Sequence, residues 1–310
     1  MPSSLQWIKR VITVGIGGVF LFLLFRFRND FHLVLDITPG IFITLSFLVF
    51  LSIAINGFKL NCITRSFGIG LALKEWIGLA FISATLNGVV FKSGSMVTSN
   101  YLKRKHEFSY AAFVGAMGAD HLMMIFINAF VGLGISAWLV FSGINLLLPV
   151  AGCFFALVLG LMLVMRRRFT FDKRSNSFFE AIARAVETLD TILQNKTLFR
   201  ALLLQNLFLI AIMGLRFYAA CQVLSLDIPL VHCYLFTTVT AFVRLVPMIQ
   251  SDIGSRELVV GFLSAAVGSG FKEGMLATVV DRIFELFWAV LIAACFKNIL
   301  FPPPKEKTFA

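Results

Sequence analysis

The chain has 310 residues, of which 59% are hydrophobic and 14% charged, with a formal net charge of +11. Soluble domains carry about 25% charged residues, so this composition excludes a soluble globular protein and indicates an integral membrane protein. The apolar runs are continuous rather than alternating, which predicts spanning helices and excludes a β-barrel. Lys and Arg concentrate in the loops, as in cytoplasmic loops of membrane proteins, and no basic soluble domain is present to bind nucleic acid.

The first half opens with an apolar run over residues 11–25, preceded by Lys9 and Arg10. No small-residue cleavage site follows this run, so we expect an uncleaved first helix with a cytoplasmic N-terminus. A second helix is expected over residues 41–60. The loop after it is interpreted as cytoplasmic from three basic residues, Lys59, Arg65 and Lys74.

Residues 76–91 are apolar, but they fall short of the roughly 20 residues that a helix needs to cross a bilayer. Basic residues lie on both sides of this segment, which suggests that it enters and leaves the membrane on the same face. We therefore predict a re-entrant pair of half-helices with its tip near Asn87 and Gly88.

The remainder of the first half is simpler. The next helix is expected within residues 110–141, and residues 146–165 return to the basic cluster at 166–168. Apolar residues then recur at three- and four-residue steps over residues 177–196, with acidic residues on the other face, which predicts an amphipathic helix. We expect this helix on the inner membrane surface, with a packed soluble helix as the alternative.

In the second half, residues 198–224 form the next expected span, and residues 275–296 form the last. Two short apolar segments lie between them, at 232–246 and 258–267. If the C-terminal tail is cytoplasmic, these two segments must enter and leave from the outside. They would form a second re-entrant pair, opposite in sense to the first.

The predicted fold is therefore an all-α polytopic membrane protein with about six full transmembrane helices and two oppositely oriented re-entrant pairs. The spacing supports an inverted repeat, since 26 residues separate Gly94 from Asp120 and 27 separate Gly254 from Asp281; coincidence is the alternative. Inverted repeats with broken helices are typical of transporters that bind their substrate near the midplane. The chain is expected to form one domain: first half 1–165, cytoplasmic loop 166–197, second half 198–300, tail 301–310.

Ionisable residues inside apolar segments are the candidate site. A charge at the middle of a membrane helix costs about 2.5–3.5 kcal/mol on insertion scales, so such residues usually face a protein interior or a wet cavity. The candidate cavity-lining residues are Asp120, His121, Arg216, Arg244, Asp252, Arg256, Glu257, Asp281, Arg282 and Glu285. The candidate residues that shape the re-entrant backbone are Asn87, Gly94, Ser95, Pro247, Gly254 and Ser255.

Several of these residues allow two interpretations. Glu257 is expected to pair with Arg282 or to contact a cationic headgroup, and a purely structural ion pair is the alternative. Arg216 requires an acidic partner, with Asp120 or Glu257 as candidates, or a lipid phosphate.

Three more positions remain open in the same way. Asp281 and Glu285 are four residues apart and share a helix face, which lines the cavity or lies in outer solvent. Arg244 lines the cavity or extends to the membrane surface.

No cofactor or metal is expected. The five cysteines are scattered without C-x-x-C spacing and are interpreted as packing residues, and His121 has no second ligand at metal-binding spacing. The chain lacks a G-x-x-x-x-G-K-[ST] motif, so transport would be downhill, proton-coupled or driven by a partner. If it is proton-coupled, Asp120 and His121 are the expected carriers.

Two groups of residues resemble one known family. Pro247, Gly254, Glu257 and the later Arg282 resemble the P-x-x-G-G-x-G-x-x-E pattern, followed by a helix Arg, of the flippase-like transmembrane domain of lysylphosphatidylglycerol synthases. The first-half pattern of that family is similar to Asn87, residues 92–95, Tyr101-Leu102 and Asp120-His121.

The resemblance covers about residues 5–300, with three departures. Asp252-Ile253 stands where a glycine pair is usual, Lys92 where proline is frequent, and His121 where Arg is common. These departures bear on the substrate more than on the fold.

The resemblance implies a lipid flippase of the inner membrane that binds a headgroup in a polar intramembrane cavity and moves lipids, such as aminoacylated phosphatidylglycerol, between leaflets. Because the sequence stops at Ala310, we expect a stand-alone member without the soluble synthase domain. A non-catalytic subunit for lipid, hopanoid or glycolipid synthesis is one alternative. A membrane-embedded enzyme acting on a lipid-linked substrate is another, although no catalytic motif supports it. Expected partners are membrane lipids, with a lipid-synthesis enzyme or a second copy in a homodimer as further options.

Overall fold

The computed structural model describes residues 37–89, 92–166, 177–243 and 254–301, together with Phe22 and Phe25. Every regular element within these ranges is a helix, which confirms the all-α polytopic prediction. The first predicted span lies almost wholly outside the described residues. Five described helices are long and apolar enough to cross a membrane: α2 (Pro39–Ser66), α5 (Tyr110–Phe141), α6 (Leu148–Arg166), α8 (Lys196–Val223) and α11 (Phe271–Leu300).

The outer faces of these long helices are apolar. Phe47 on α2, Phe130 and Phe141 on α5 and Phe208 on α8 are all exposed on the protein surface. Soluble monomers rarely expose contiguous apolar patches of this kind, because water penalises them. In a bilayer the same side chains contact acyl chains, so the surface fits a multi-pass membrane protein.

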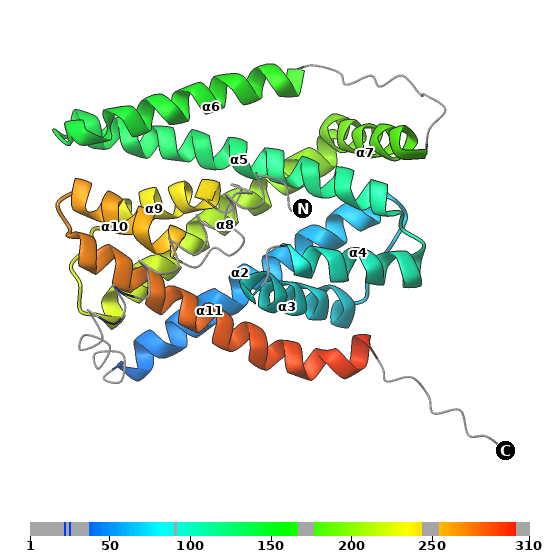
Figure 1. Ribbon diagram of the computed structural model, residues 1–310, viewed down its shortest axis with the longest axis horizontal. Helices are drawn as coiled ribbons and strands as arrows, with labels where there is room; N and C mark the ends of the chain where they lie inside the picture. The colour runs from blue at the N-terminus through cyan, green and yellow to red at the C-terminus, as the bar shows by residue number, and fades with distance from the viewer. Residues whose placement is uncertain are drawn as a thin grey trace, which may run out of the picture.

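Four shorter helices form two hairpins: α3 (Leu73–Val89) with α4 (Ser93–His106), and α9 (Leu230–Val243) with α10 (Ser255–Ala266). Figure 1 shows the α3–α4 hairpin toward one end of the long axis and the α9–α10 hairpin toward the other. Helix α3 continues through the predicted tip to Val89, and Lys92, directly before α4, adopts a left-handed backbone with φ 57°. The turn of the second hairpin lies outside the described residues.

Helix α11 is the common support of both hairpins. Near its C-terminus, α11 packs on α3, where a side chain at Gly78 would meet Phe296 and Leu300. Gly88, near the end of α3, lies against Leu286. The other hairpin approaches α11 from its N-terminal end, and Glu257 at the start of α10 bonds to Arg282. The inner ends of both hairpins therefore meet α11 near its middle.

Helix α2 differs from its prediction. It continues to Ser66, six residues beyond the expected end, so Lys59 lies inside the helix and is buried. The interpretation of Lys59 as a marker of the cytoplasmic loop is therefore wrong. The helix tolerates a buried cation here because Asp120 on α5 neutralises it.

The amphipathic helix α7 (Ser177–Gln194) packs on the first half of α5. Gly115 of α5 lets it approach closely, since a side chain at this position would collide with the carbonyl of Ala185. Ile192 is buried in this contact region with residues of α5 and α8. The apolar face of α7 therefore packs on protein, as in the alternative prediction of a packed helix, rather than only on lipid.

Candidate functional site

The larger of two buried ionic clusters centres on Arg216 in α8. Its guanidinium makes a bidentate contact with Asp281 of α11, Nε to Oδ1 at 2.6 Å and Nη2 to Oδ2 at 2.8 Å. Nη2 also donates to Glu285 Oε2 at 2.7 Å, and Nη1 donates to Ser52 Oγ of α2 at 3.0 Å. Only 1% of the Arg216 side chain is exposed, so protein atoms replace water around this charge.

Helix α10 adds a second layer to this cluster. Arg256 donates from Nη2 to Asp281 Oδ2 at 2.6 Å, and Arg282 donates from Nη1 to Glu257 Oε1 at 2.7 Å. The other oxygen of Glu257 accepts the backbone N–H of Gly254 at 2.8 Å, which holds the start of α10. Because Glu257 is fully buried, its charge is satisfied only by these protein groups.

The cluster is electrically balanced within the described part of the chain. Its six ionisable members are Arg216, Arg256, Arg282, Glu257, Asp281 and Glu285. Three cations and three anions neutralise one another, as a buried set of charges requires. The buried Nε of Arg256 has no hydrogen-bond partner among the residues that the structure describes. This N–H is available to a ligand oxygen if the cluster opens.

The smaller cluster joins α2, α5 and α8. The ammonium of Lys59 lies 2.9 Å from Asp120 Oδ2 and 3.1 Å from Oδ1. It also donates to Asn206 Oδ1 at 3.2 Å, and Asn206 Nδ2 donates to Asp120 Oδ1 at 3.3 Å. All three side chains are buried, and the three N–H groups of the Lys59 ammonium donate to protein acceptors.

The two clusters occupy equivalent positions in the two halves of the chain. Lys59 is the twenty-first residue of α2, and Arg216 is the twenty-first residue of α8. Asp120 is the eleventh residue of α5, and Asp281 is the eleventh residue of α11. Each half therefore carries one cation–carboxylate pair at the same helix positions, which supports the predicted match of Asp120 with Asp281.

The clusters also tie the halves together. Lys59 of the first half contacts Asn206 of the second, and Arg216 of the second half contacts Ser52 of the first. Both contacts cross the interface between α2 and α8, two helices that pack extensively on each other. A movement of one half against the other would therefore disturb both clusters.

The structure corrects one predicted pairing and confirms another. Arg216 binds Asp281 and Glu285 rather than Asp120 or Glu257, and Asp120 is instead paired with Lys59, two helical turns along α2 from Ser52. The predicted Glu257–Arg282 pair is present.

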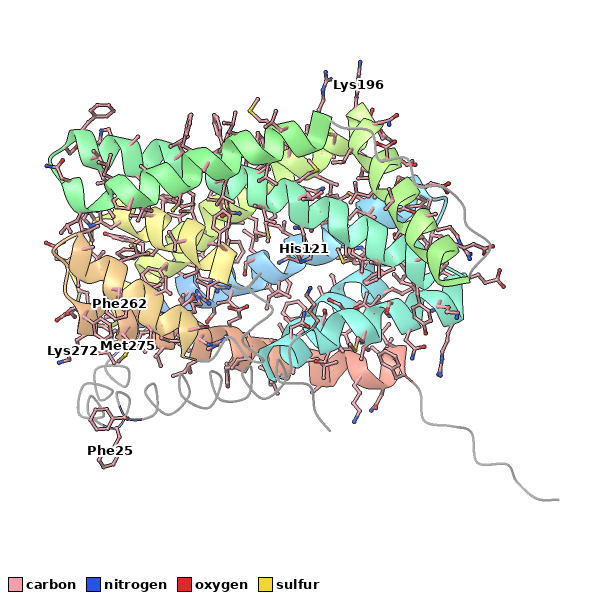
Figure 2. All side chains as sticks on the ribbon, turned by 45° about the horizontal axis from the view of Figure 1, so that its top comes forward. Phe25, His121, Lys196, Phe262, Lys272 and Met275 are labelled. Carbon is pink, nitrogen blue, oxygen red and sulfur yellow. The ribbon has the colours of Figure 1, made fainter. Side chains whose placement is uncertain are left out.

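His121 belongs to neither cluster, although Figure 2 places it in the middle of the molecule. Its Nδ1 lies 2.6 Å from the backbone carbonyl of Met117 in its own helix. Arg244, Pro247 and Asp252 lie outside the described residues.

The predicted backbone residues shape the inner ends of the hairpins. Asn87 Oδ1 accepts the backbone N–H of Gly94 at 2.9 Å, which closes the turn between α3 and α4. A side chain at Gly94 would collide with Ser83, so glycine permits the close approach of the two helices. Gly254 has φ 90°, a left-handed region that favours glycine, directly before α10. Ser95 is half-buried and Ser255 is buried at the first turns of α4 and α10.

A crevice opens beside the smaller cluster, between α5, α8 and α9. It is mostly apolar, with Leu209, Ile210 and Met213 on one side, and its polar lining includes Asn128, Asn206 and Thr237. Asn206 separates this crevice from the Lys59–Asp120 pair. The larger cluster does not line it. The predicted polar cavity is thus represented by a crevice at one cluster, while in the other cluster Arg216, Arg256, Glu257 and Asp281 are buried and Arg282 and Glu285 are partly exposed.

Sequence reasoning missed Lys59, Asn206 and Ser52 as site residues. The expected helix over residues 41–60 puts Lys59 at its last residue but one, and extending that helix to Ser66 would have moved Lys59 into its interior, at the position that Arg216 occupies in its own helix. Asn206 and Ser52 are uncharged, and such residues are frequent in membrane helices, so no comparable signal marks them.

A third cluster lies at the outer base of the α3–α4 hairpin, outside the five candidate spans. Glu75 Oε1 accepts from Tyr101 at 2.8 Å and lies 2.7 Å from the ammonium of Lys105, while Oε2 accepts the backbone N–H of Ala72 at 2.8 Å. Burial alone would raise the pKa of Glu75. The hydrogen bonds and the charge of Lys105 outweigh this effect, so the pKa of Glu75 falls to about 2. This cluster fastens the two ends of the hairpin together.

The described ranges hold no group of three His, Cys, Asp or Glu side chains that could bind a metal ion.

Comparison with known families identifies one match. The model of the lysylphosphatidylglycerol synthase TM region matches residues 10–294. Comparison with curated proteins found no match.

Proposed function

Because the chain belongs to the lysylphosphatidylglycerol synthase transmembrane family, we propose that it binds a lipid headgroup in its polar interior and transfers it between leaflets. The acyl chains remain in the bilayer during this transfer. We place the protein in the cell inner membrane, with both termini in the cytoplasm. The two short hairpins act as re-entrant elements, one from each side.

One observation carries the proposal: two hairpins reach the middle of α11 from opposite ends and meet there beside a buried ionic cluster. Gly88 of the first hairpin lies against Leu286, and Glu257 of the second pairs with Arg282, one turn away. Broken helices that meet at the midplane, in halves of opposite orientation, are the arrangement in which secondary transporters bind substrates.

The energetics of the cluster support a functional role. Removing charges from water is expensive, and well-packed apolar residues of similar volume often give equal or greater stability than a buried ion network. Six such charges around α11 are therefore a poor means of stabilising a membrane protein. A headgroup that carries both charge and hydrogen-bonding oxygens gives these charges a function, and Arg256 Nε provides a donor that has no partner within the described ranges.

Reconstitution tests this function. The full chain is placed in vesicles that contain a phospholipid labelled on its acyl chain. A membrane-impermeant quencher added outside removes the signal of the outer leaflet, so transfer appears as loss of the protected inner-leaflet signal. We expect the wild-type protein to move the label faster than protein-free vesicles. Glu257→Gln and Arg282→Ala should slow the movement by at least about tenfold, since each removes a charge-assisted hydrogen bond.

Lys196→Met is the matched control, because Lys196 is exposed at the start of α8, at the edge of the molecule in Figure 2, whereas Arg216 lies near the other end of the same helix. Equal movement in the two cluster variants and the wild type would remove these residues from the mechanism. No movement by the folded wild-type protein would contradict the transport function itself.

A further inference from the structure

The smaller cluster differs from the larger one in its access. The crevice between α5, α8 and α9 reaches Asn206, and Asn206 contacts both members of the Lys59–Asp120 pair. Rotation of the Asn206 side chain alone would expose the Lys59–Asp120 pair to the crevice. The equivalent Arg216–Asp281 pair is held by Arg256, Glu285 and Ser52 and does not line this crevice.

The charges of the smaller cluster restrict what it can bind. Its hydrogen-bonded members, Lys59, Asp120 and Asn206, hold one cation and one anion, and His121 next to Asp120 bonds to its own helix. An anionic ligand on Lys59 alone would leave the Asp120 carboxylate unpaired in a buried site. Removing one partner of a buried ion pair is strongly destabilising, because the other charge is left without compensation. A cationic ligand on Asp120 would likewise leave the Lys59 ammonium buried without a charged partner.

Building on the proposed lipid transfer, we propose that Lys59 and Asp120 form a binding site for a zwitterionic phospholipid headgroup, with the phosphate on Lys59 and the ammonium on Asp120. This exchange replaces one internal ion pair with two external ones and leaves no buried charge without a partner. The carboxylate has two oxygens for an ammonium, and the Lys59 ammonium has three donors for phosphate oxygens. The site thus selects for a headgroup with both charges.

The walls of the crevice suit the rest of such a lipid. Leu209, Ile210 and Met213 present apolar surface from α8, and Met124 does so from α5. Thr237 and Thr240 donate their hydroxyls to backbone carbonyls of their own helix, which leaves their methyl groups for contact. The headgroup would lie at Asn206 and one acyl chain along the crevice.

The test uses vesicles of phosphatidylethanolamine and phosphatidylglycerol in equal amounts, with the purified full chain. A trace of either lipid, labelled on its acyl chain, reports movement of a zwitterionic or an anionic headgroup. We expect labelled phosphatidylethanolamine to move at least about tenfold faster than labelled phosphatidylglycerol, a difference that one charge-assisted contact supplies. The double variant Lys59→Met with Asp120→Asn should lose this preference.

The double variant removes both charges together, so it leaves no unpaired charge to prevent folding, and its thermal unfolding in detergent verifies that. Lys196→Met is the control and should keep the preference. Equal or faster movement of phosphatidylglycerol by the wild type would overturn the zwitterionic class while leaving lipid transfer intact. An unchanged preference in the folded double variant would overturn the site. Movement of neither lipid would instead contradict the proposed function on which this inference rests.

Discussion

Asp281 shows how strongly single residues in the larger cluster depend on one another. Its two oxygens accept three short hydrogen bonds from two guanidinium groups, those of Arg216 and Arg256. Only 1% of its side chain is exposed, so water cannot substitute for it. Loss of its charge would leave two buried cations with a single nearby anion, Glu285.

We therefore expect Asp281→Asn to lower the free energy of unfolding by about 3–5 kcal/mol, the typical effect of breaking a buried ion pair on one side. Unfolding in mixed detergent, followed by circular dichroism, measures the change. Asp227→Asn is the matched control because Asp227 is exposed, and it should stay within about 0.5 kcal/mol of the wild type. A similar small effect of Asp281→Asn would show that the cluster is solvated.

Glu75 makes a pH-dependent prediction at the same scale. Its pKa in the folded protein is about 2, below the ordinary value of 4.5, so the unfolded chain takes up its proton first as the pH falls. The stabilisation from Glu75 should be fully present above pH 4.5 and should be lost progressively as the pH falls toward 2. The measurement is the difference in melting temperature between the wild type and Glu75→Gln across this range.

Two neighbouring lysines provide the control for that profile. Lys105 lies 2.7 Å from Glu75 and helps to lower its pKa, whereas Lys103 lies over the ring of Tyr110. Lys105→Met should therefore flatten the pH dependence, and Lys103→Met should leave it unchanged. A pH-independent difference between the wild type and Glu75→Gln would contradict the assignment.

At the scale of elements, close helix contacts at glycine fix the hairpins. The inner end of the first hairpin closes where Gly94 of α4 lies against Ser83 of α3, and a side chain there would meet both the backbone carbonyl and the hydroxyl of Ser83. Gly274 of α11 plays a similar part where it packs on Ser264 of α10. Small residues at helix contacts allow this close packing in membranes.

Gly94→Ala should destabilise the protein by about 1–3 kcal/mol, because an added methyl group in a packed contact forces the helices apart. Gly134→Ala on α5 is the control, since Gly134 has open space around it and should tolerate the methyl group. Thermal unfolding in detergent compares the two variants. Equal stability of Gly94→Ala and Gly134→Ala would mean that α3 and α4 do not approach as closely as the structure shows.

Sequence alone predicts the elements better than their contacts. The lengths of apolar segments were enough to separate long spans from short hairpins, and Glu257 with Arg282 could be paired from their family-like spacing. The partner of Arg216 could not be predicted, because α8 packs between α2 and α11 and composition does not decide which acid faces it. Lys59 was misplaced because a lysine near the end of an apolar run ordinarily marks a loop.

At the scale of the whole molecule, the two halves repeat with opposite direction. Cation–carboxylate pairs stand at the same positions of α2 and α5 as of α8 and α11, and Figure 1 shows the two hairpins toward opposite ends. From this arrangement we expect the outer bases of the two hairpins to lie on different sides of the membrane. The loops that carry these bases contain Glu107 and Ser269.

Single-cysteine labelling of these two loops tests the central claim most directly. Glu107→Cys and Ser269→Cys are made separately in a chain whose five native cysteines are replaced, and a membrane-impermeant maleimide is added to intact cells and to inverted vesicles. We predict that Ser269→Cys is labelled in intact cells and that Glu107→Cys is labelled only in inverted vesicles. Labelling of both positions from the same side would contradict the inverted repeat and the transfer mechanism built on it.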